Sequence, residues 1–147
     1  MGPKGRVLVV DDEPAIRALV AKIVDRAGYP VDSARDGAEA IEMLEARTYS
    51  VIVLDLMMPN VDGYGLIEYV KSCPDSHPAI IVISAGDSAA LRRLDGSVVH
   101  SILRKPFDID VLGDLITAAA HTMDEQAAKR ASADADVLPF PKSDAVC

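Results

Sequence analysis

The 147-residue chain has no tryptophan, two cysteines, few aromatic residues of any kind and no long apolar run. Cys73 and Cys147 resemble neither a disulfide framework nor a metal-ligand cluster, so we interpret both as free thiols in a reducing compartment. Residues 1–6 lack the apolar stretch of a signal peptide, and no segment approaches the roughly 20 apolar residues that a membrane helix needs. We therefore expect a cytoplasmic protein that does not span a membrane.

Basic clusters are also missing, because the net charge is -8 and no Lys/Arg-rich run occurs. A nucleic-acid-binding surface needs such a basic footprint, and an acidic chain is repelled by anionic lipid. We therefore expect neither nucleic acid nor membrane as a partner. The length is that of one domain, and half of the residues are apolar, which is enough to form a core.

Strand-like and helix-like segments alternate along the chain. Five segments are predicted to be strands, of which Val7–Val10 and Val51–Leu54 are continuous apolar runs typical of buried strands and Tyr29–Ala34 is a weaker strand. The five are Val7–Val10, Tyr29–Ala34, Val51–Leu54, Ala79–Ile83 and Val98–Leu103. Between them the pattern predicts five helices: from Asp12-Glu13-Pro14 to Gly28, after the capping pair Asp36 and Glu39, around Leu66–Val70, over Ser88–Leu94, and from Asp108 to about Met123. This order favours an α/β fold with a doubly wound, five-stranded parallel sheet and helices on both faces.

The periodic pattern ends near Met123. We predict an N-terminal leader over residues 1–5, one domain over 6–123 and a disordered tail over 124–147, into which the last helix could extend by a turn or two. The inward face of that last helix is predicted to carry four apolar residues: Ile109, Leu112, Ile116 and Ala119.

Polar residues stand where the predicted strands end, and ligands of open parallel sheets bind at the carboxyl ends of strands. These residues are Asp11, Asp12, Asp55, Ser84 and Lys105. Clustered carboxylates repel by roughly 4 kcal/mol per pair at 4 Å and an effective dielectric near 20, which favours binding of a divalent cation such as Mg²⁺. Each residue alone has an ordinary structural explanation: Asp12 as a helix cap, Asp55 as a loop acid, Ser84 as a turn residue and Lys105 as a surface lysine. Their joint occurrence at one edge indicates phosphoryl chemistry.

Five short motifs make the chain resemble response-regulator receiver domains of two-component signalling. They are Val9-Val10-Asp11-Asp12-Glu13-Pro14, Leu54-Asp55-Leu56-Met57-Met58-Pro59, Asp62-Gly63, Ser84-Ala85 and Lys105-Pro106-Phe107. The resemblance implies a flavodoxin-like fold with strand order 2-1-3-4-5 and a cis Lys105-Pro106 bond. It implies these site residues: Asp55 as phosphoacceptor, Lys105 as phosphate-pairing cation, Ser84 as switch hydroxyl, and Asp12, Asp55, the Met57 backbone carbonyl and, through water, Asp11 as Mg²⁺ ligands.

The resemblance also implies a function and partners. The chain would take a phosphoryl group from a histidine kinase or a histidine phosphotransfer protein, and it would act on an unidentified output protein as a monomer or weak dimer. It would be a switch and no enzyme beyond its own phosphorylation and dephosphorylation. Two alternatives are an interaction module that needs no phosphorylation and a haloacid-dehalogenase-like hydrolase. The latter needs a second Asp where Met57 stands.

Three departures from the family pattern lie near the fifth strand. Ile102 replaces the usual aromatic residue, Val98-Val99 replaces Gly-Ala, and the segment Asp87–Ser97 is short and lacks the usual long pattern of a fourth helix. A buried Ile102 would have little reason to alternate between core and solvent. We therefore predict that phosphorylation moves the loop Ala85–Ala89 while Ile102 keeps one rotamer.

Overall fold

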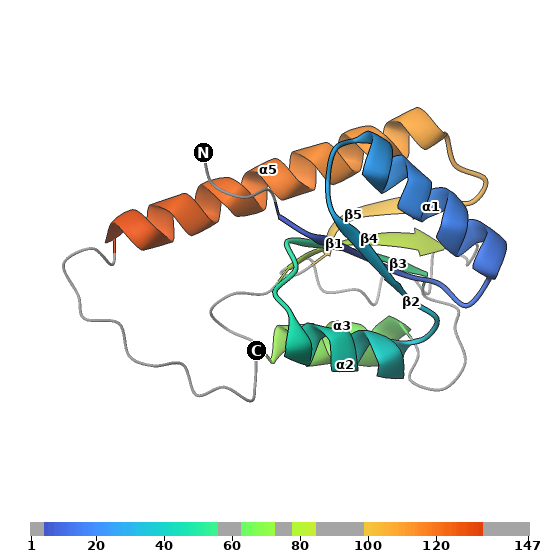
Figure 1. The fold of residues 1–147 in the computed structure, drawn as a ribbon, viewed down its shortest axis with the longest axis horizontal. Coiled ribbons are helices and arrows are strands. Elements are labelled where there is room, and N and C mark those ends of the chain that lie inside the picture. Colours follow the sequence, from blue (N-terminus) through green and yellow to red (C-terminus); the bar gives the residue numbers. More distant parts are fainter. Residues whose placement is uncertain (1–4, 56–62, 73–77, 85–98, 134–147) are drawn as a thin grey trace.

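A computed structural model of the chain describes residues 5–55, 63–72, 78–84 and 99–133. Figure 1 shows a central sheet with α1 and α5 on one face and α2 and α3 on the other. The elements in chain order are β1 (Val7–Val10), α1 (Pro14–Arg26), β2 (Val31–Ala34), α2 (Gly37–Ala46), β3 (Val51–Asp55), α3 (Gly63–Lys71), β4 (Ala79–Ser84), β5 (Val99–Arg104) and α5 (Ile109–Ala133).

The five strands form one parallel sheet in the order β2-β1-β3-β4-β5, as predicted. The strands β1, β3 and β4 are buried at every position because helices cover both faces of the sheet. Alternate residues serve two cores: Leu8 and Val10 pack on the α2–α3 side, and Val7 and Val9 pack on the α1–α5 side. Continuous apolar runs in the sequence reflect this double coverage.

Local sequence signals set the starts and ends of the first two helices. Proline at position 14 begins α1, where its missing N–H removes no hydrogen bond, and Gly28 follows the helix with a φ of 93°. At α2, a side-chain oxygen of Asp36 accepts a hydrogen bond from the Glu39 N–H at 2.8 Å. The Glu39 carboxylate in turn accepts from the N–H of Arg35, one residue before the cap, so the predicted capping pair forms with a small variation.

The last helix begins as predicted, because Asp108 accepts a hydrogen bond from the Asp110 N–H at 2.8 Å. Three of its four predicted inward residues are fully buried: Leu112, Ile116 and Ala119. The prediction for Ile109 was wrong, since 46% of this residue is exposed. It belongs to the first turn and lines a groove between α1 and α5 instead of packing on the sheet.

The prediction that α5 ends near Met123 was also wrong, because the helix continues to Ala133. The ten extra residues are four alanines with Asp, Glu, Gln, Lys, Arg and Ser, and neither Gly nor Pro occurs among them. Such residues mostly favour a helix even where no apolar stripe marks a buried face. The helix therefore extends ten residues into the segment predicted to be a tail, further than the turn or two that we allowed for, and residues 134–147 lie outside the described part of the chain.

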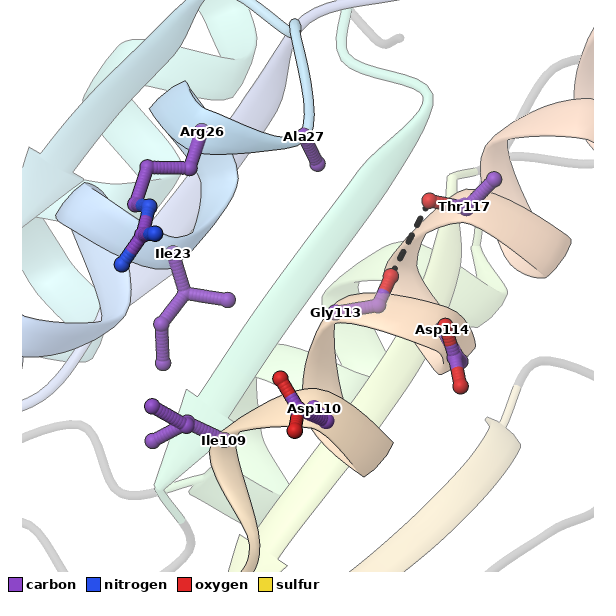
Figure 2. A pocket seen from close by; sticks show the side chains of 8 residues that line it. All are labelled: Ile23, Arg26, Ala27, Ile109, Asp110, Gly113, Asp114 and Thr117. Atoms are coloured by element: carbon purple, nitrogen blue, oxygen red, sulfur yellow. Dashed lines mark hydrogen bonds between the residues drawn. The ribbon is translucent and has the colours of Figure 1, made fainter.

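Gly113 forms part of the wall of the α1–α5 groove, which has a volume of about 380 Å³ (Figure 2). A methyl group at this position would lie 3.7 Å from Cγ2 of Ile23, an ordinary packing distance. The hydroxyl of Thr117 donates to the Gly113 carbonyl at 3.0 Å, one turn along the helix. The groove is thus bounded by helix backbone on one side and by an apolar side chain of α1 on the other.

The prediction that Ile102 is buried was wrong, because β5 is an edge strand of the sheet. Burial alternates along β5, and Ile102 is 42% exposed instead of buried. It lies opposite Val82 in the register, at the edge of the sheet where strand pairing ends on one side. The premise for a fixed Ile102 rotamer therefore fails.

The predicted helix over 88–94 and the loop Ala85–Ala89 lie outside the described residues. Among the described helices, none is long and apolar enough to cross a membrane.

Candidate functional site

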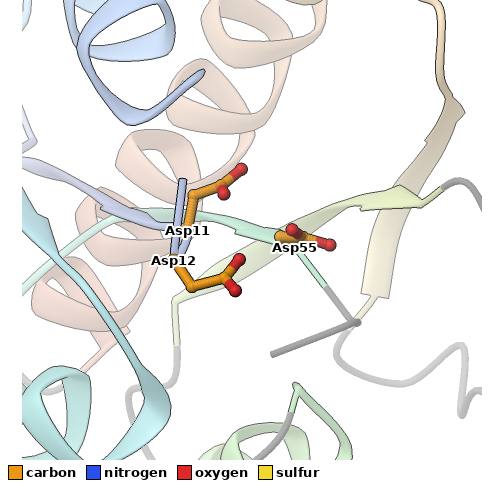
Figure 3. Close-up of side chains that lie close together, drawn as sticks. All are labelled: Asp11, Asp12 and Asp55. Carbon is orange, nitrogen blue, oxygen red and sulfur yellow. The ribbon is translucent and has the colours of Figure 1, made fainter. Parts of the chain in front are cut away.

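Three carboxylates meet at the carboxyl edge of the sheet. Asp11 and Asp12 follow β1, and Asp55 is the last residue of the neighbouring β3. A carboxylate oxygen of each lies within 4.8 Å of an oxygen from the other two, and Figure 3 shows Asp11 and Asp12 extending toward Asp55. Because apolar strands bury the backbone on both sides, Asp11 and Asp55 are almost completely shielded from solvent, whereas Asp12 is exposed.

Hydrogen bonds hold the first acid in place. The Asp11 N–H donates to the Ala34 carbonyl at 3.2 Å, and one of its carboxylate oxygens accepts from the Glu13 N–H at 2.9 Å. The Asp11 carbonyl accepts from Nη1 of Arg17 at 2.8 Å. The turn between β1 and α1 is therefore fixed from three directions.

The electrostatic state of Asp11 reflects this crowding. Burial is the largest cause that raises its pKa, and the charges of Asp55 and Asp12 raise it further. The hydrogen bond from Glu13 and the charge of Lys105 act in the opposite direction, and the pKa reaches about 6 instead of the ordinary 3.8. Two carboxylates at this separation repel by roughly 3 kcal/mol at an effective dielectric near 20. The edge is thus an acidic site at which a bound cation would offset the repulsion between carboxylates.

A cation and a hydroxyl complete the edge. Nζ of Lys105 lies 3.5 Å from Oδ2 of Asp55, and Ser84 is fully buried at the end of β4. The backbone joins these two residues, since the Lys105 N–H donates to the Ser84 carbonyl at 3.1 Å. The peptide bond between Lys105 and Pro106 is cis, as predicted. All predicted side chains of the site therefore come from one edge of the sheet; Met57, predicted to contribute its backbone carbonyl, lies outside the described residues.

The donor atoms fit a hard divalent cation. Carboxylate oxygens are the ligands that Mg²⁺ and Ca²⁺ accept, and Mg²⁺ commonly uses one or two carboxylates and keeps several waters. Asp12 is open to solvent and Asp55 lies beside it, so a partly hydrated ion could reach both. Among the described residues, the cluster contains carboxylates and neither sulfur nor imidazole, which favours a hard cation over a soft metal.

A second polar cluster, which the sequence analysis missed, lies toward the amino ends of β1 and β2. Asp32 accepts a hydrogen bond from the buried Tyr49 hydroxyl at 2.7 Å and forms ion pairs with Arg6 at 3.3 Å and Arg47 at 3.8 Å. Burial and the Asp32 carboxylate raise the pKa of Tyr49 to about 12. These residues are far apart in sequence and meet only through strand register. The signal that could have indicated this cluster is Asp32 itself, an acid inside the predicted strand Tyr29–Ala34, because a partly buried carboxylate needs donors or cations beside it.

The fold and the acidic edge define a class: a doubly wound parallel α/β domain with an oxygen-rich cation site beside a lysine. Comparison with known proteins then gives the family. The family model described as the response regulator receiver domain matches residues 7–117. The chain belongs to this family and is a receiver domain of the two-component response-regulator type, as its motifs suggested.

Relatives and solved structures agree with this assignment. Response regulator MprA of Mycobacterium ulcerans (strain Agy99) is 38% identical over 109 residues, which cover 73% of this chain and 46% of that protein. The chain thus spans about half the length of the curated relatives it matches. The receiver domain of the Francisella response regulator 1452 superposes with a TM-score of 0.72 at 31% identity, covering 80% of this chain and 98% of that one.

A further solved structure bears on the acidic edge. Response regulator protein TrrA from Thermotoga maritima, described as a complex with Mg²⁺ and BeF, has a TM-score of 0.70 and 29% identity. The match covers 78% of this chain and 98% of that one. A phosphoacceptor role is typical of this family, and the acids on which such a role depends are present here.

Proposed function

We propose that this chain is a phosphoacceptor in a two-component phosphorelay, in which Asp55 takes a phosphoryl group from a phosphohistidine. The observation that supports the proposal is the environment of Asp55. The Asp55 carboxylate is nearly buried at the end of β3, lies 3.5 Å from the Lys105 ammonium group and is beside two further acids. A carboxylate held next to a cation can attack phosphorus when nearby charge offsets that of the phosphoryl oxygens.

The donor in this proposal is a histidine kinase or a histidine phosphotransfer protein. A carboxylate oxygen of Asp55 forms the new O–P bond while the P–N bond of the phosphohistidine breaks. The electron pair of that bond leaves with the imidazole nitrogen, which takes up a proton. Lys105 then lies within reach of the phosphoryl oxygens, because its Nζ is already beside Oδ2 of Asp55.

Asp12 and Asp55 would bind Mg²⁺ directly, the backbone carbonyl of Met57 would add a third ligand, and Asp11 would act through a water molecule. When bound, Mg²⁺ supplies positive charge opposite the transferring phosphoryl group. Support comes from the all-oxygen donor set and from the Mg²⁺ and BeF in the description of TrrA. The raised pKa of Asp11 means that the cluster holds its full negative charge only above about pH 6.

Ser84 connects phosphorylation to output in this proposal. Its hydroxyl would donate a hydrogen bond to a phosphoryl oxygen, and the loop that follows would change position and alter the binding of an output protein. The chain then works as a signalling switch in the cytoplasm, as a monomer or weak dimer, and catalyses only its own phosphorylation and dephosphorylation. Residues 6–123 would carry this function.

Phosphorylation of Asp55 can be tested directly. The protein is incubated with MgCl₂ and acetyl phosphate and then separated by phosphate-affinity electrophoresis. We expect a retarded band that is absent in Asp55→Ala. Asp114→Ala is the matched control, because it removes an exposed carboxylate on α5 and should leave the band unchanged. A retarded band of wild-type intensity in Asp55→Ala would overturn the assignment.

A further inference from the structure

We infer that Arg17 is a positioning residue that holds the turn between β1 and α1 in the shape needed to bind a divalent cation. The inference rests on the proposed function, since it concerns the same acidic edge. Arg17 bears no carboxylate and is not a ligand. It acts through Asp11, whose carbonyl oxygen accepts a hydrogen bond from Nη1 of Arg17 at 2.8 Å.

This contact reaches backward across the start of α1. The Arg17 N–H donates to the Glu13 carbonyl at 2.9 Å, so the residue belongs to the first hydrogen-bonded turn of the helix. Side chains in a helix point toward its N-terminus, which allows the guanidinium group to return six residues to Asp11. Arg17 is partly buried, so the side chain lies against the protein and not in free solvent.

The position of the charge supports a specific role. The N-terminal end of a helix carries a partial positive charge, so a cation there is ordinarily unfavourable. No acidic residue lies in the first turn of α1 itself, and the nearest acids, Asp12 and the N-cap residue Glu13, precede the helix. The Arg17 side chain also extends out of the helix in this direction, because its guanidinium group donates to the Asp11 carbonyl immediately before the exposed Asp12.

Mutual repulsion makes such a restraint useful. Three carboxylates lie within 4.8 Å of one another, and Asp12 is exposed to solvent. The N–H and carboxylate of Asp11 are held by backbone groups of Ala34 and Glu13, and the Arg17 side chain holds the carbonyl that leads into Asp12. Losing this bond would let the turn relax and separate the acids. A cation would then have to restore their arrangement when it binds.

The test measures MgCl₂ binding to the full chain by backbone amide NMR, in wild type, Arg17→Ala, Arg17→Lys and Arg26→Ala. Removing a group that orients metal ligands typically weakens metal affinity about 10- to 100-fold, and we expect a loss in this range for Arg17→Ala. Arg17→Lys should recover part of it, because an ammonium group can also donate to a carbonyl. Arg26→Ala is the matched control: Arg26 is exposed in the last turn of the same helix.

Phosphorylation by acetyl phosphate gives a second measurement. For Arg17→Ala we expect the Mg²⁺ concentration at half-maximal rate to rise, while the rate at saturating Mg²⁺ stays within about twofold of wild type. A lower melting temperature with unchanged Mg²⁺ affinity would overturn the inference and leave Arg17 a merely structural role. Equal weakening in Arg26→Ala would overturn it as well. If wild type itself bound no Mg²⁺ and accepted no phosphate, the proposed function would fail along with it.

Discussion

The two edges of the sheet use charged residues in opposite ways. At the carboxyl edge, Asp11, Asp12 and Asp55 place like charges within 4.8 Å of one another, and burial raises the pKa of Asp11. Toward the amino edge, Asp32 is surrounded by donors: the Tyr49 hydroxyl and two arginine side chains. The amino-edge cluster pairs one acid with two arginines, whereas the carboxyl-edge cluster places three acids beside Lys105 and keeps an excess of negative charge. We expect a cation from solution to bind at the edge where this excess remains.

The carboxyl edge provides the largest expected effect on stability. Without metal, Asp11→Asn should stabilise the protein at pH 7.5 by about 1–3 kcal/mol, because each unit of pKa shift corresponds to about 1.4 kcal/mol. The pKa of Asp11 in the folded protein, about 6, exceeds its ordinary value of 3.8. The stability of wild type relative to Asp11→Asn is therefore highest below about pH 4, and this contribution is lost as the pH rises through about 6. Urea unfolding between pH 4 and 7.5 measures the difference.

The asparagine variant retains an acceptor for the Glu13 N–H, which makes it a conservative change. Asp114→Asn makes the same chemical change at an exposed position of α5, and its effect should not vary with pH in this way. A constant stability difference between Asp11→Asn and wild type across the pH range would contradict the explanation by burial and repulsion.

At the amino edge, removing a polar group should lower the stability of the protein instead of raising it. Tyr49→Phe removes the hydroxyl that donates to Asp32, and we expect a loss of about 1–2 kcal/mol at pH 7, since Asp32 retains its arginines. The raised pKa of Tyr49, about 12, adds stability that is fully present below about pH 10 and is lost as the pH rises through 12. The gap between wild type and Tyr49→Phe should therefore close in alkaline solution.

Arg47→Ala serves as the control for this cluster. Its contact with Asp32 is 3.8 Å long and its side chain is 56% exposed, so the loss should not exceed about 0.5 kcal/mol and should shrink with added salt. Thermal or urea unfolding of both variants gives the comparison. An equal loss in Arg47→Ala and Tyr49→Phe would show that ion pairing, and not the buried hydroxyl, holds this edge together.

A change on neither edge should have a smaller effect than Asp11→Asn or Tyr49→Phe. Gly113→Ala should stabilise the protein by about 0.5–1 kcal/mol, because glycine inside a helix is less favourable than alanine and the new methyl group would meet Ile23 at 3.7 Å. Mg²⁺ affinity should not change. A loss of stability in urea unfolding would mean that the α1–α5 groove does not tolerate even one added carbon.

Much of the fold could be predicted because its strongest signals are local. The runs Val7–Val10, Val51–Leu54 and Ala79–Ile83 are apolar at every position, as strands covered on both faces must be. The acids and the lysine of the site could be predicted for a related reason. They stand where those runs end, and parallel strands bring their carboxyl ends to one edge.

Other features depend on surroundings that local patterns do not encode. Ile102 and Ile109 are apolar residues in positions that periodicity assigns to a core, yet one lies on an edge strand and the other in a first helical turn beside a groove. The end of α5 depends on helix propensity, which persists after the apolar stripe has ended. The contact between Asp32 and Tyr49 arises from the return of the chain after α2, which only the folded structure specifies.

The buried acid at position 11 has a consequence for attempts to engineer this domain. A search for heat-resistant variants, if carried out without metal and without a measure of phosphorylation, would favour neutral side chains at Asp11 and its neighbours. Those substitutions relieve the repulsion described above. Such a search would yield proteins with higher melting temperatures that lack the carboxylates of the proposed cation site. A useful screen for robust variants must therefore keep the site under selection while it raises the temperature.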